Sequence, residues 1–397
     1  LCGSLACVNA MYDDSTLAAV GEQLERVADR DFYAEKFADA GVDPTAVDSW
    51  ADFRSLPFTT AGELEADFEA APPSGSLYDG AAMVTFSPMG EQLRPVFDTA
   101  DDLEAQAAAN ADVLERAGVE PGDRVVNTFG YELFGTGYVL HRALERLGAE
   151  VFPLGPGDSE QAAATIEAYD VDAVVGNPSF ALKIGAEGGS VDTFVGAGEP
   201  FTSIPGRREA VKDALDASTA VDYFGTRHIM PVAAETAAED GLRVVDDYAV
   251  VEVVDPDTGE VLDAGKRGEV VVTHLRKAGV PLVRYRTGDL AELAVRDGTV
   301  VLPDGVIGRT DERLKVKGVK VYPESIETVL AGFEGLTGEY RVEVSQPETT
   351  DRLVVICEGE ADADELRAAL GDRLIVTPDA VELVADLDEP GVVDERY

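Results

Sequence analysis

The chain has few cysteines and no long apolar run. Three cysteines in 397 residues, Cys2, Cys7 and Cys357, are too few and too scattered for a disulfide framework or a zinc cluster. We therefore expect a reducing environment and a cytoplasmic protein. No apolar run approaches the length of a membrane span. The sequence also lacks internal repeats and low-complexity tracts.

Basic residues are also scarce. Lys and Arg total 32 against 77 Asp and Glu, which gives a formal net charge of −45. Such a charge repels nucleic acid and anionic membranes, so neither is an expected partner. Because 45% of the residues are hydrophobic, the composition predicts a folded protein with an acidic surface rather than a disordered chain. This surface suits a salty (halophilic) cytoplasm, where about 1 M salt shortens the screening length to ~3 Å.

The first ten residues are mildly apolar and carry no basic region, which argues against a secretion signal. We expect residues 1–10 to be a disordered leader and Met11 to be the native start.

Helical and strand patterns alternate from residue 101 to residue 225. This rhythm predicts an α/β domain with a doubly wound, mostly parallel sheet. Ligands of such sheets bind beyond the carboxyl ends of the strands. The helical patterns cover 101–118, 138–148, 159–170 and 205–217, and the strand patterns cover 122–130, 149–155, 172–178 and 220–225.

The pattern changes after Gly241. Strand-rich segments at 249–262, 268–275 and 280–293 predict a distorted barrel or meander attached to the sheet. A small α+β unit follows, which we expect to act as a lid. The predicted organisation is thus a large N-terminal domain over 11–307 and a small C-terminal domain over 308–397.

The most informative stretch contains two motifs in fixed order, RYRTGD at 284–289 and GRTDER at 308–313. Asp289 can accept hydrogen bonds from both hydroxyls of a ribose, and Arg309 can reach a ribose or a phosphate with its fork of donors. Asp311, close to a glycine and between two folded regions, is a candidate hinge. A hairpin with surface charges explains the first motif alone equally well, but it explains the pair poorly.

This order of motifs resembles the adenylate-forming (acyl-activating) enzymes, specifically their phenylacetate–coenzyme A ligase and coenzyme F390 synthetase branch. The resemblance extends to 127–157, which looks like the segment that walls the acyl and coenzyme A pocket. It assigns this pocket to Tyr131, Phe134, Gly135, Pro178 and Lys317.

The resemblance also implies a nucleotide site. A loop at 197–200 looks like the one that passes beside the adenine, and it contributes Gly198, Glu199 and Pro200. The family's phosphate loop reads like SSGTTGKP, and here Ser87, Gly90 and Arg94 remain of it. Pro88 removes one backbone N–H, and Glu91 places a negative charge where phosphates should bind.

The segment DYFGTRHIMP at 222–231 departs further from the family. Phe224, Gly225 and Thr226 keep the nucleotide-binding part. Arg227 replaces a hydroxyl residue that contacts phosphate, and His228 replaces the Glu that holds magnesium; we keep both as catalytic candidates. Magnesium prefers oxygen ligands, so Glu235 is the substitute ligand that we consider.

Other candidates are few. The family's C-terminal lysine is missing, since no lysine follows Lys320 and only Arg396 is basic in the tail. His141 is expected to line a pocket or a boundary, and His274 to be structural. No G-x-S-x-G motif supports a serine hydrolase. Lys315 and Lys320, with Lys317, form either a solvated rim or a site for an anionic ligand.

The expected function is therefore an AMP-forming carboxylate–coenzyme A ligase that uses ATP, Mg²⁺ and coenzyme A on an aryl or similar acid. Two alternatives stay open. One is a non-catalytic descendant that binds a nucleotide or an acyl-coenzyme A as a sensor or partner subunit, and the other is an enzyme that kept only the thioester half-reaction. The oligomeric state also stays open, with a homodimer as one option.

Overall fold

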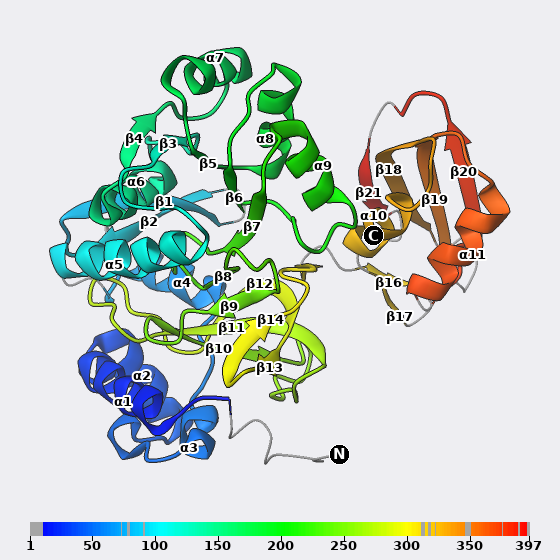
Figure 1. Cartoon of the computed structure of the whole chain (residues 1–397). Coiled ribbons are helices and arrows are strands. Elements are labelled where there is room, and N and C mark those ends of the chain that lie inside the picture. The colour runs from blue at the N-terminus through cyan, green and yellow to red at the C-terminus, as the bar shows by residue number, and fades with distance from the viewer. Residues whose placement is uncertain are drawn as a thin grey trace. The chain divides into compact units, whose positions relative to one another are not determined.

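The computed structural model describes the chain except for residues 1–10, 73, 78–79, 90–91, 311–313, 317–318, 322, 346–350, 375, 388–389 and 395–397. It divides into two compact units, one of 1–201, 209–287 and 291–305 and the other of 202–208, 288–290 and 306–397. Figure 1 shows the elements of both. In the described part, no helix is long and apolar enough to cross a membrane.

A nine-stranded sheet forms the centre of the first unit, in the order β13-β14-β9-β8-β7-β6-β5-β3-β4. The strands from β4 to β7 pair in parallel, and β8, β9, β14 and β13 extend the sheet with antiparallel pairs. The bounds are β3 (Arg124–Asn127), β4 (Glu150–Pro153), β5 (Ala173–Gly176), β6 (Thr193–Ala197), β7 (Thr219–Phe224), β8 (Ala233–Ala234), β9 (Leu242–Val244), β13 (Ala294–Arg296) and β14 (Thr299–Leu302).

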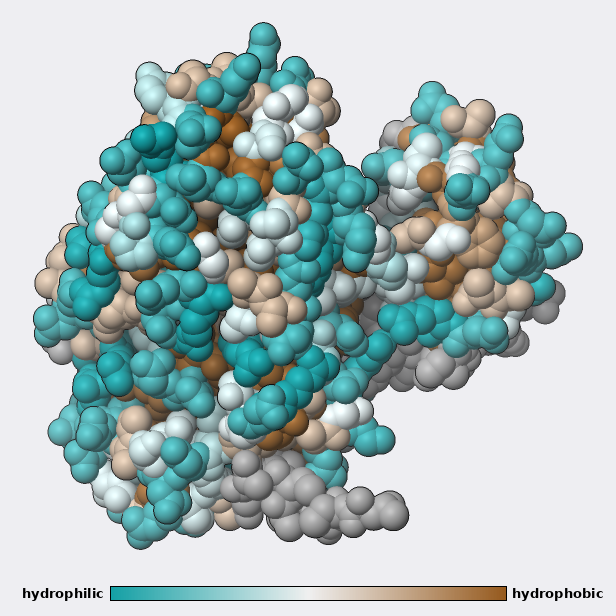
Figure 2. Space-filling view, in the orientation of Figure 1, coloured by the Kyte–Doolittle hydropathy of each residue, from teal (hydrophilic) through white to brown (hydrophobic). Residues whose placement is uncertain are grey.

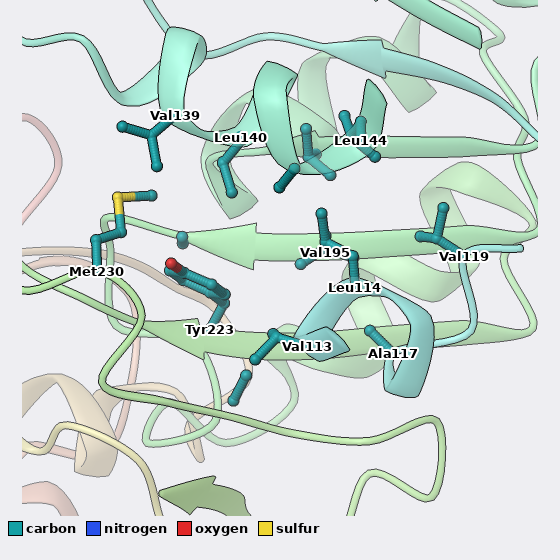
Figure 3. Close-up of a cluster of buried hydrophobic side chains, with 14 of the residues drawn as sticks. Val113, Leu114, Ala117, Val119, Val139, Leu140, Leu144, Val195, Tyr223 and Met230 are labelled. Carbon is teal, nitrogen blue, oxygen red and sulfur yellow. The ribbon is translucent and has the colours of Figure 1, made fainter. Parts of the chain in front are cut away.

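Helices cover both faces of the parallel strands. On β5, Ala173 and Val175 belong to one hydrophobic cluster and Val174 to another, as the alternation of side chains along a strand requires. The first cluster includes α5 and α6 and is shown in Figure 3. The second includes α7, α8 and α9. The bounds are α5 (Ala100–Arg116), α6 (Thr136–Leu147), α7 (Ser159–Tyr169), α8 (Pro178–Ala186) and α9 (Arg207–Leu215).

The N-terminal helices pack on a separate core. Trp50, Phe53 and Tyr33 from these helices are buried with Leu282 and Tyr285. The helix α4 begins with a capping box, in which Thr60 and Glu63 exchange hydrogen bonds with each other's backbone N–H. The bounds are α1 (Asp14–Ala28), α2 (Asp31–Ala40), the 3₁₀ helix η2 (Pro44–Ala46), α3 (Trp50–Ser55) and α4 (Ala61–Ala70).

Two smaller sheets complete this part of the chain. The strands β1 (Met83–Met89) and β2 (Gln92–Asp98) form an antiparallel hairpin. A four-stranded sheet has the order β10-β11-β12-β15, with β10 (Ala249–Val254), β11 (Arg267–His274), β12 (Tyr285–Glu292) and β15 (Gly308–Arg309). The pairing of β15 with β12 involves residues 289–290 of β12, which belong to the second unit.

The second unit is a small α+β fold. A four-stranded sheet of order β20-β19-β18-β21 shares a hydrophobic core with α10 and α11, which includes Ile326, Val342, Val355 and Leu370. The bounds are β16 (Leu314–Val316), β17 (Val319–Val321), α10 (Pro323–Leu330), β18 (Leu336–Ser345), β19 (Arg352–Gly359), α11 (Ala363–Leu374), β20 (Ala380–Val384) and β21 (Gly391–Asp394).

The predicted α/β fold class is confirmed, with one difference in the strand-rich region. We expected a barrel or meander beside the main sheet after Gly241. Instead β9, β13 and β14 join the main sheet, and only β10, β11, β12 and β15 form a sheet of their own. Hydrophilic residues cover most of the face shown in Figure 2.

Candidate active site

The candidate site is built around the loop that follows β7, the strand that ends at Phe224. Phe224 is 8% exposed. The loop then closes on itself, because Thr226 N–H donates to Ile229 O at 2.7 Å. Asn110 on α5 donates to Met230 O at 3.1 Å and accepts from the Tyr223 hydroxyl at 2.6 Å. Tethered at both ends, this loop holds Arg227 and His228 in place.

Arg227 points inward, toward the β1–β2 hairpin. Its Nε donates to Thr85 Oγ1 at 2.5 Å and its Nη2 to Asp98 Oδ2 at 2.5 Å. The side chain is only 6% exposed. Its Nη1 is buried without a hydrogen-bond partner among the described residues. The residue that replaces a phosphate-contacting hydroxyl is therefore used to fasten the loop to the hairpin.

Asp98 is shared with a second buried cation, Lys277, whose Nζ donates to Asp98 Oδ1. Lys277 also lies 3.7 Å from Asp102 Oδ2, and all three side chains are less than 5% exposed. Asp102 accepts from the N–H groups of Ala278 and Gly279 at 2.6 and 2.8 Å. We refer to Asp98, Asp102, Arg227 and Lys277 as the buried charge network.

The electrostatics of this network are balanced. Burial alone would raise the pKa of Asp102, but Lys277 and the backbone N–H groups lower it below its ordinary value, so Asp102 is a carboxylate at neutral pH. The two carboxylates thus offset the two cations, as burial of charged groups requires. The network therefore offers little net positive charge to a ligand.

His228 is held as a neutral imidazole. Burial, with the charges of Arg227 and Lys277, lowers its pKa to about 4. Its Nε2 is buried and has no hydrogen-bond partner in the described part of the chain. It lines a small cavity with Arg94, Phe68 and Val280. The volume, about 20 Å³, suits a water molecule or two.

The buried His274, at the end of β11, supports this loop. Its Nδ1 accepts from Leu282 N–H at 3.0 Å, so its Nε2 carries the proton that it donates to His228 O at 2.9 Å. This geometry agrees with the structural role expected for His274.

Glu235, the predicted metal ligand, follows β8 and accepts a hydrogen bond from the backbone of β7. It is 1% exposed, and its two carboxylate oxygens accept the N–H groups of Asp222 and Gly241 at 2.9 and 3.1 Å. In this structure it therefore stabilises the backbone around β7. Among the residues that the structure describes, no three His, Cys, Asp or Glu side chains are grouped to hold a metal ion.

The phosphate-loop residues lie on the β1–β2 hairpin. Ser87 is buried and pairs in register with Arg94. Arg94 forms an ion pair with Glu65 of α4 and lies 3.7 Å from Glu69. The predicted phosphate ligand is thus paired with acidic groups. Gly90 and Glu91 lie outside the described residues.

The loops predicted to surround the adenine form a compact corner. Glu199 accepts from Ser179 N–H at 3.0 Å and from its hydroxyl at 2.5 Å, which caps the start of α8 beside Pro178. Gly198 has φ of 82°, and a Cβ there would lie 2.8 Å from Asn177 Nδ2, so only glycine fits. Pro200, half-buried, follows Glu199 in the same loop.

The ribose candidates lie together in the second unit. Asp289 and Arg309 are opposite each other on β12 and β15, and Arg309 Nη1 donates to Asp289 Oδ1 at 2.9 Å. Gly288 allows this approach, because a Cβ there would lie 2.9 Å from Arg309 Nη2. The Asp289 carboxylate of the first motif and the Arg309 guanidinium of the second motif therefore lie side by side. Asp311 and Lys317 lie outside the described residues, as does Arg396.

Three of the predicted acyl pocket residues, Tyr131, Phe134 and Gly135, lie between β3 and α6, whereas Pro178 begins α8. Gly135 has φ of 65° and a Cβ there would lie 2.4 Å from Thr85 Cγ2, so glycine allows the loop to approach β1. Phe134 is 49% exposed. Tyr131 is half-buried, and its hydroxyl oxygen lies 3.1 Å from His141 Nδ1.

Sequence reasoning missed four residues of the site, Thr85, Asp98, Asp102 and Lys277. The signal that could have found them is Arg227 itself, since an arginine in a buried loop requires a carboxylate partner. Asp98, at the end of an apolar strand pattern, was a candidate for that partner.

Comparisons with known proteins identify the family of this chain. A model of the AMP-binding enzyme C-terminal domain matches residues 318–384. The phenylacetate-coenzyme A ligase of Escherichia coli is 31% identical over 340 residues, which are 82% of this chain and 77% of that one. The enzyme of the same name from Thermus thermophilus is 30% identical over 363 residues, 87% of this chain and 80% of that one.

Solved structures share the fold. A 2-hydroxyisobutyryl-CoA ligase in complex with 2-HIB-AMP has a TM-score of 0.85 at 24% identity, over 97% of this chain and 90% of that one. The same enzyme with 2-HIB-AMP and CoA, in its thioesterification state, has a TM-score of 0.71 at 25% identity over the same shares. Fold and sequence together define an adenylate-forming enzyme. The chain belongs to the phenylacetate–coenzyme A ligase-like branch, whose members are AMP-forming acid–thiol ligases.

Proposed function

We propose that this ligase converts an aryl or similar carboxylic acid into its coenzyme A thioester. Its first half-reaction is slow, and its site binds magnesium poorly. The observation that carries the proposal is the burial of Arg227 in the ion pair with Asp98. At the position where the family places a hydroxyl on phosphate, this chain has a side chain that is already engaged.

The aryl substrate is supported by the relatives. The similar enzymes of Escherichia coli and Thermus thermophilus are phenylacetate–coenzyme A ligases, and Tyr131, Phe134 and Gly135 lie in the segment that resembles the family's acyl pocket. The half-exposed ring of Phe134 suits an aromatic or similarly apolar acid.

The first half-reaction joins the acid to ATP. A carboxylate oxygen attacks the α-phosphorus, pyrophosphate leaves, and an acyl-adenylate remains. The protein must stabilise charge that develops on the phosphoryl oxygens. The charge-balanced network and the neutral His228 supply little of this stabilisation, which is why we expect this step to be slow.

Magnesium does not fit the described residues. His228 offers a nitrogen, which is a poor ligand for this ion, and the oxygens of Glu235 accept backbone N–H groups. We therefore assign no step to a metal bound by these residues.

The second half-reaction transfers the acyl group to the coenzyme A thiol, and AMP leaves. It requires no pyrophosphate departure, so neither Arg227 nor His228 limits it. We assign the binding of the adenosine ribose to Asp289 and Arg309. We keep Asp311 as the hinge about which the small C-terminal domain rotates when the enzyme passes from the first half-reaction to the second.

The ribose assignment predicts a loss of nucleotide affinity in Asp289→Ala. A hydrogen bond to a charged group contributes about 1.5–3 kcal/mol, so AMP should bind roughly ten- to a hundred-fold more weakly. Calorimetric titration in multimolar KCl measures this. Asp263→Ala removes an exposed carboxylate and is the matched control. Equal affinities in wild type and Asp289→Ala would remove the assignment.

The imbalance between the half-reactions predicts that a synthetic phenylacetyl-adenylate with coenzyme A turns over faster than phenylacetate, ATP and coenzyme A together. The expected ratio is about 10² or more, because one lost transition-state contact costs 10²–10³-fold. His228→Glu, which restores an oxygen ligand, should narrow the ratio, while the neutral His228→Gln serves as the control.

Two results would contradict the proposal. An ordinary rate of ~10 per second for the ATP-dependent reaction would show that adenylation is intact. Binding of AMP without turnover of either substrate set would favour the non-catalytic alternative, a sensor or partner subunit.

A further inference from the structure

A series of polar side chains in contact with one another runs from the end of β3 to the surface of α6. Asn127 Nδ2 donates to the Tyr131 hydroxyl at 3.0 Å. The same hydroxyl lies 3.1 Å from His141 Nδ1, and His141 Nε2 lies 3.4 Å from Glu145 Oε1. His141 and Glu145 are four residues apart on α6, so they share one face of the helix.

The direction of each hydrogen bond follows from the partners. Asn127 Oδ1 accepts from Phe129 N–H at 3.1 Å, which fixes the orientation of its amide. The Tyr131 oxygen accepts from that amide, so its own proton is available to His141 Nδ1. His141 then carries its ring proton on Nε2, facing the Glu145 carboxylate.

The position of this series of polar side chains suits a reaction site. Asn127 is the last residue of β3, and ligands of parallel sheets bind beyond the carboxyl ends of the strands. Exposure to solvent increases along this series, from a fully buried Asn127 to a His141 side chain that is 24% exposed and a Glu145 side chain that is 63% exposed. A proton received at Tyr131 therefore has a short path to solvent.

We propose that Tyr131, His141 and Glu145 form a proton relay that deprotonates the acceptor thiol in the thioester half-reaction. Tyr131 touches the thiol, and His141 and Glu145 act through Tyr131. This inference rests on the proposed function, because it concerns the second half-reaction of the same site.

The thiol S–H bond breaks and its proton moves to the Tyr131 oxygen, while the Tyr131 O–H proton moves to His141 Nδ1. The sulfur forms a bond to the acyl carbon, and the bond from that carbon to the phosphate oxygen breaks, so AMP leaves with the electron pair. The resulting imidazolium of His141 is stabilised by Glu145 and releases its Nε2 proton to solvent.

The relay answers a chemical need. A thiol with an ordinary pKa of about 8.5 is only a few per cent thiolate at pH 7, and the thiolate is the nucleophile. Burial raises the pKa of Tyr131 to about 12, so Tyr131 stays protonated and passes a proton on rather than storing a charge.

Charged groups on α6 and on the neighbouring α5 and β4 form ion pairs of their own. Glu104 of α5 pairs with Arg146 and lies 3.8 Å from Arg142. Glu150 of β4 lies 3.5 Å from Arg124. Glu145 is thus the acidic partner that the structure places directly on His141.

The first test follows turnover of phenylacetyl-adenylate and coenzyme A against pH, with the full chain in multimolar KCl. Tyr131→Phe and His141→Gln should lose about 10²-fold at pH 7, the usual contribution of a general base. The loss should shrink to a few-fold near pH 9.5, where about nine-tenths of an ordinary thiol is already ionised. Tyr169→Phe, which removes the hydroxyl of an exposed tyrosine, is the matched control.

The outcomes separate the relay from the proposed function. An equal loss at every pH, or no loss, overturns the relay and leaves the ligase intact, since Tyr131 would then be a pocket wall or a dispensable residue. An inactive wild type overturns the proposed function and the relay with it.

A second measurement needs no turnover. The chain has three histidines, so ¹⁵N spectra of histidine-labelled protein can be assigned with His141→Gln. The relay requires the proton of His141 on Nε2 and a change in its titration midpoint in Tyr131→Phe. A proton on Nδ1 would mean that His141 donates to Tyr131, and the relay would be wrong.

Discussion

Asp98→Asn should lower the free energy of unfolding by about 3–5 kcal/mol, the cost of removing one partner from a buried ion pair. The reason is that Arg227 and Lys277 share this one carboxylate and are both nearly inaccessible to water. The amide keeps the shape of the side chain but not its charge. Urea unfolding at a fixed multimolar KCl concentration, followed by circular dichroism, measures the change.

The control for this substitution is Asp112→Asn. Asp112 pairs with Arg116 on the surface of α5, where its side chain is 58% exposed. Exposed pairs contribute about 0–1 kcal/mol, so this variant should unfold almost as the wild type does. A loss below about 1 kcal/mol in Asp98→Asn would mean that the buried charge network does not stabilise the fold as we describe it.

Folding should depend on salt for the chain as a whole. The formal charge of −45 opposes a compact state unless it is screened, and raising the salt from about 0.1 M to about 1 M shortens the screening length from ~10 to ~3 Å. We expect partial or complete loss of the native circular dichroism signal at low salt and a rising Tm across a KCl series.

Screening must be separated from general stabilisation by a solute. Sucrose also strengthens burial, by exclusion from the protein surface, but it does not screen charge. A sucrose series at low salt should therefore restore much less signal than KCl does. An unchanged Tm between low and high KCl would contradict the prediction and the interpretation of the acidic surface.

The central fold could be predicted because its strands are buried on both faces. All four residues of β5 are buried, so the strand is a continuous apolar run between two amphipathic helices. The edge of the sheet could not be predicted in the same way. Strands of two or three residues such as β8, β9 and β13 have too few positions to show a period, and the sheet that they join is decided by long-range pairing.

The site was only partly predictable for a related reason. Asp289 and Arg309 could be proposed as a pair because a motif spacing links them, and their role toward a ribose stays a prediction. Arg227 follows Asp98 by 129 residues along the chain, and Lys277 follows it by 179 residues. Charged residues are mostly exposed, so a pattern along the sequence gives no reason to bury these three together. Only the packing of the hairpin against the loop after β7 brings them into contact.

The aromatic cluster under the N-terminal helices has a practical consequence. Trp50 is the single tryptophan of the chain, and it lies 5.4 Å from the Tyr12 ring and 5.6 Å from the Phe53 ring, as ring centroids. Intrinsic fluorescence therefore reports the opening of this one corner, whereas circular dichroism reports the whole backbone. If the fluorescence changes at a lower urea concentration than the circular dichroism signal, the N-terminal helices detach before the central sheet unfolds, and a two-state analysis does not apply.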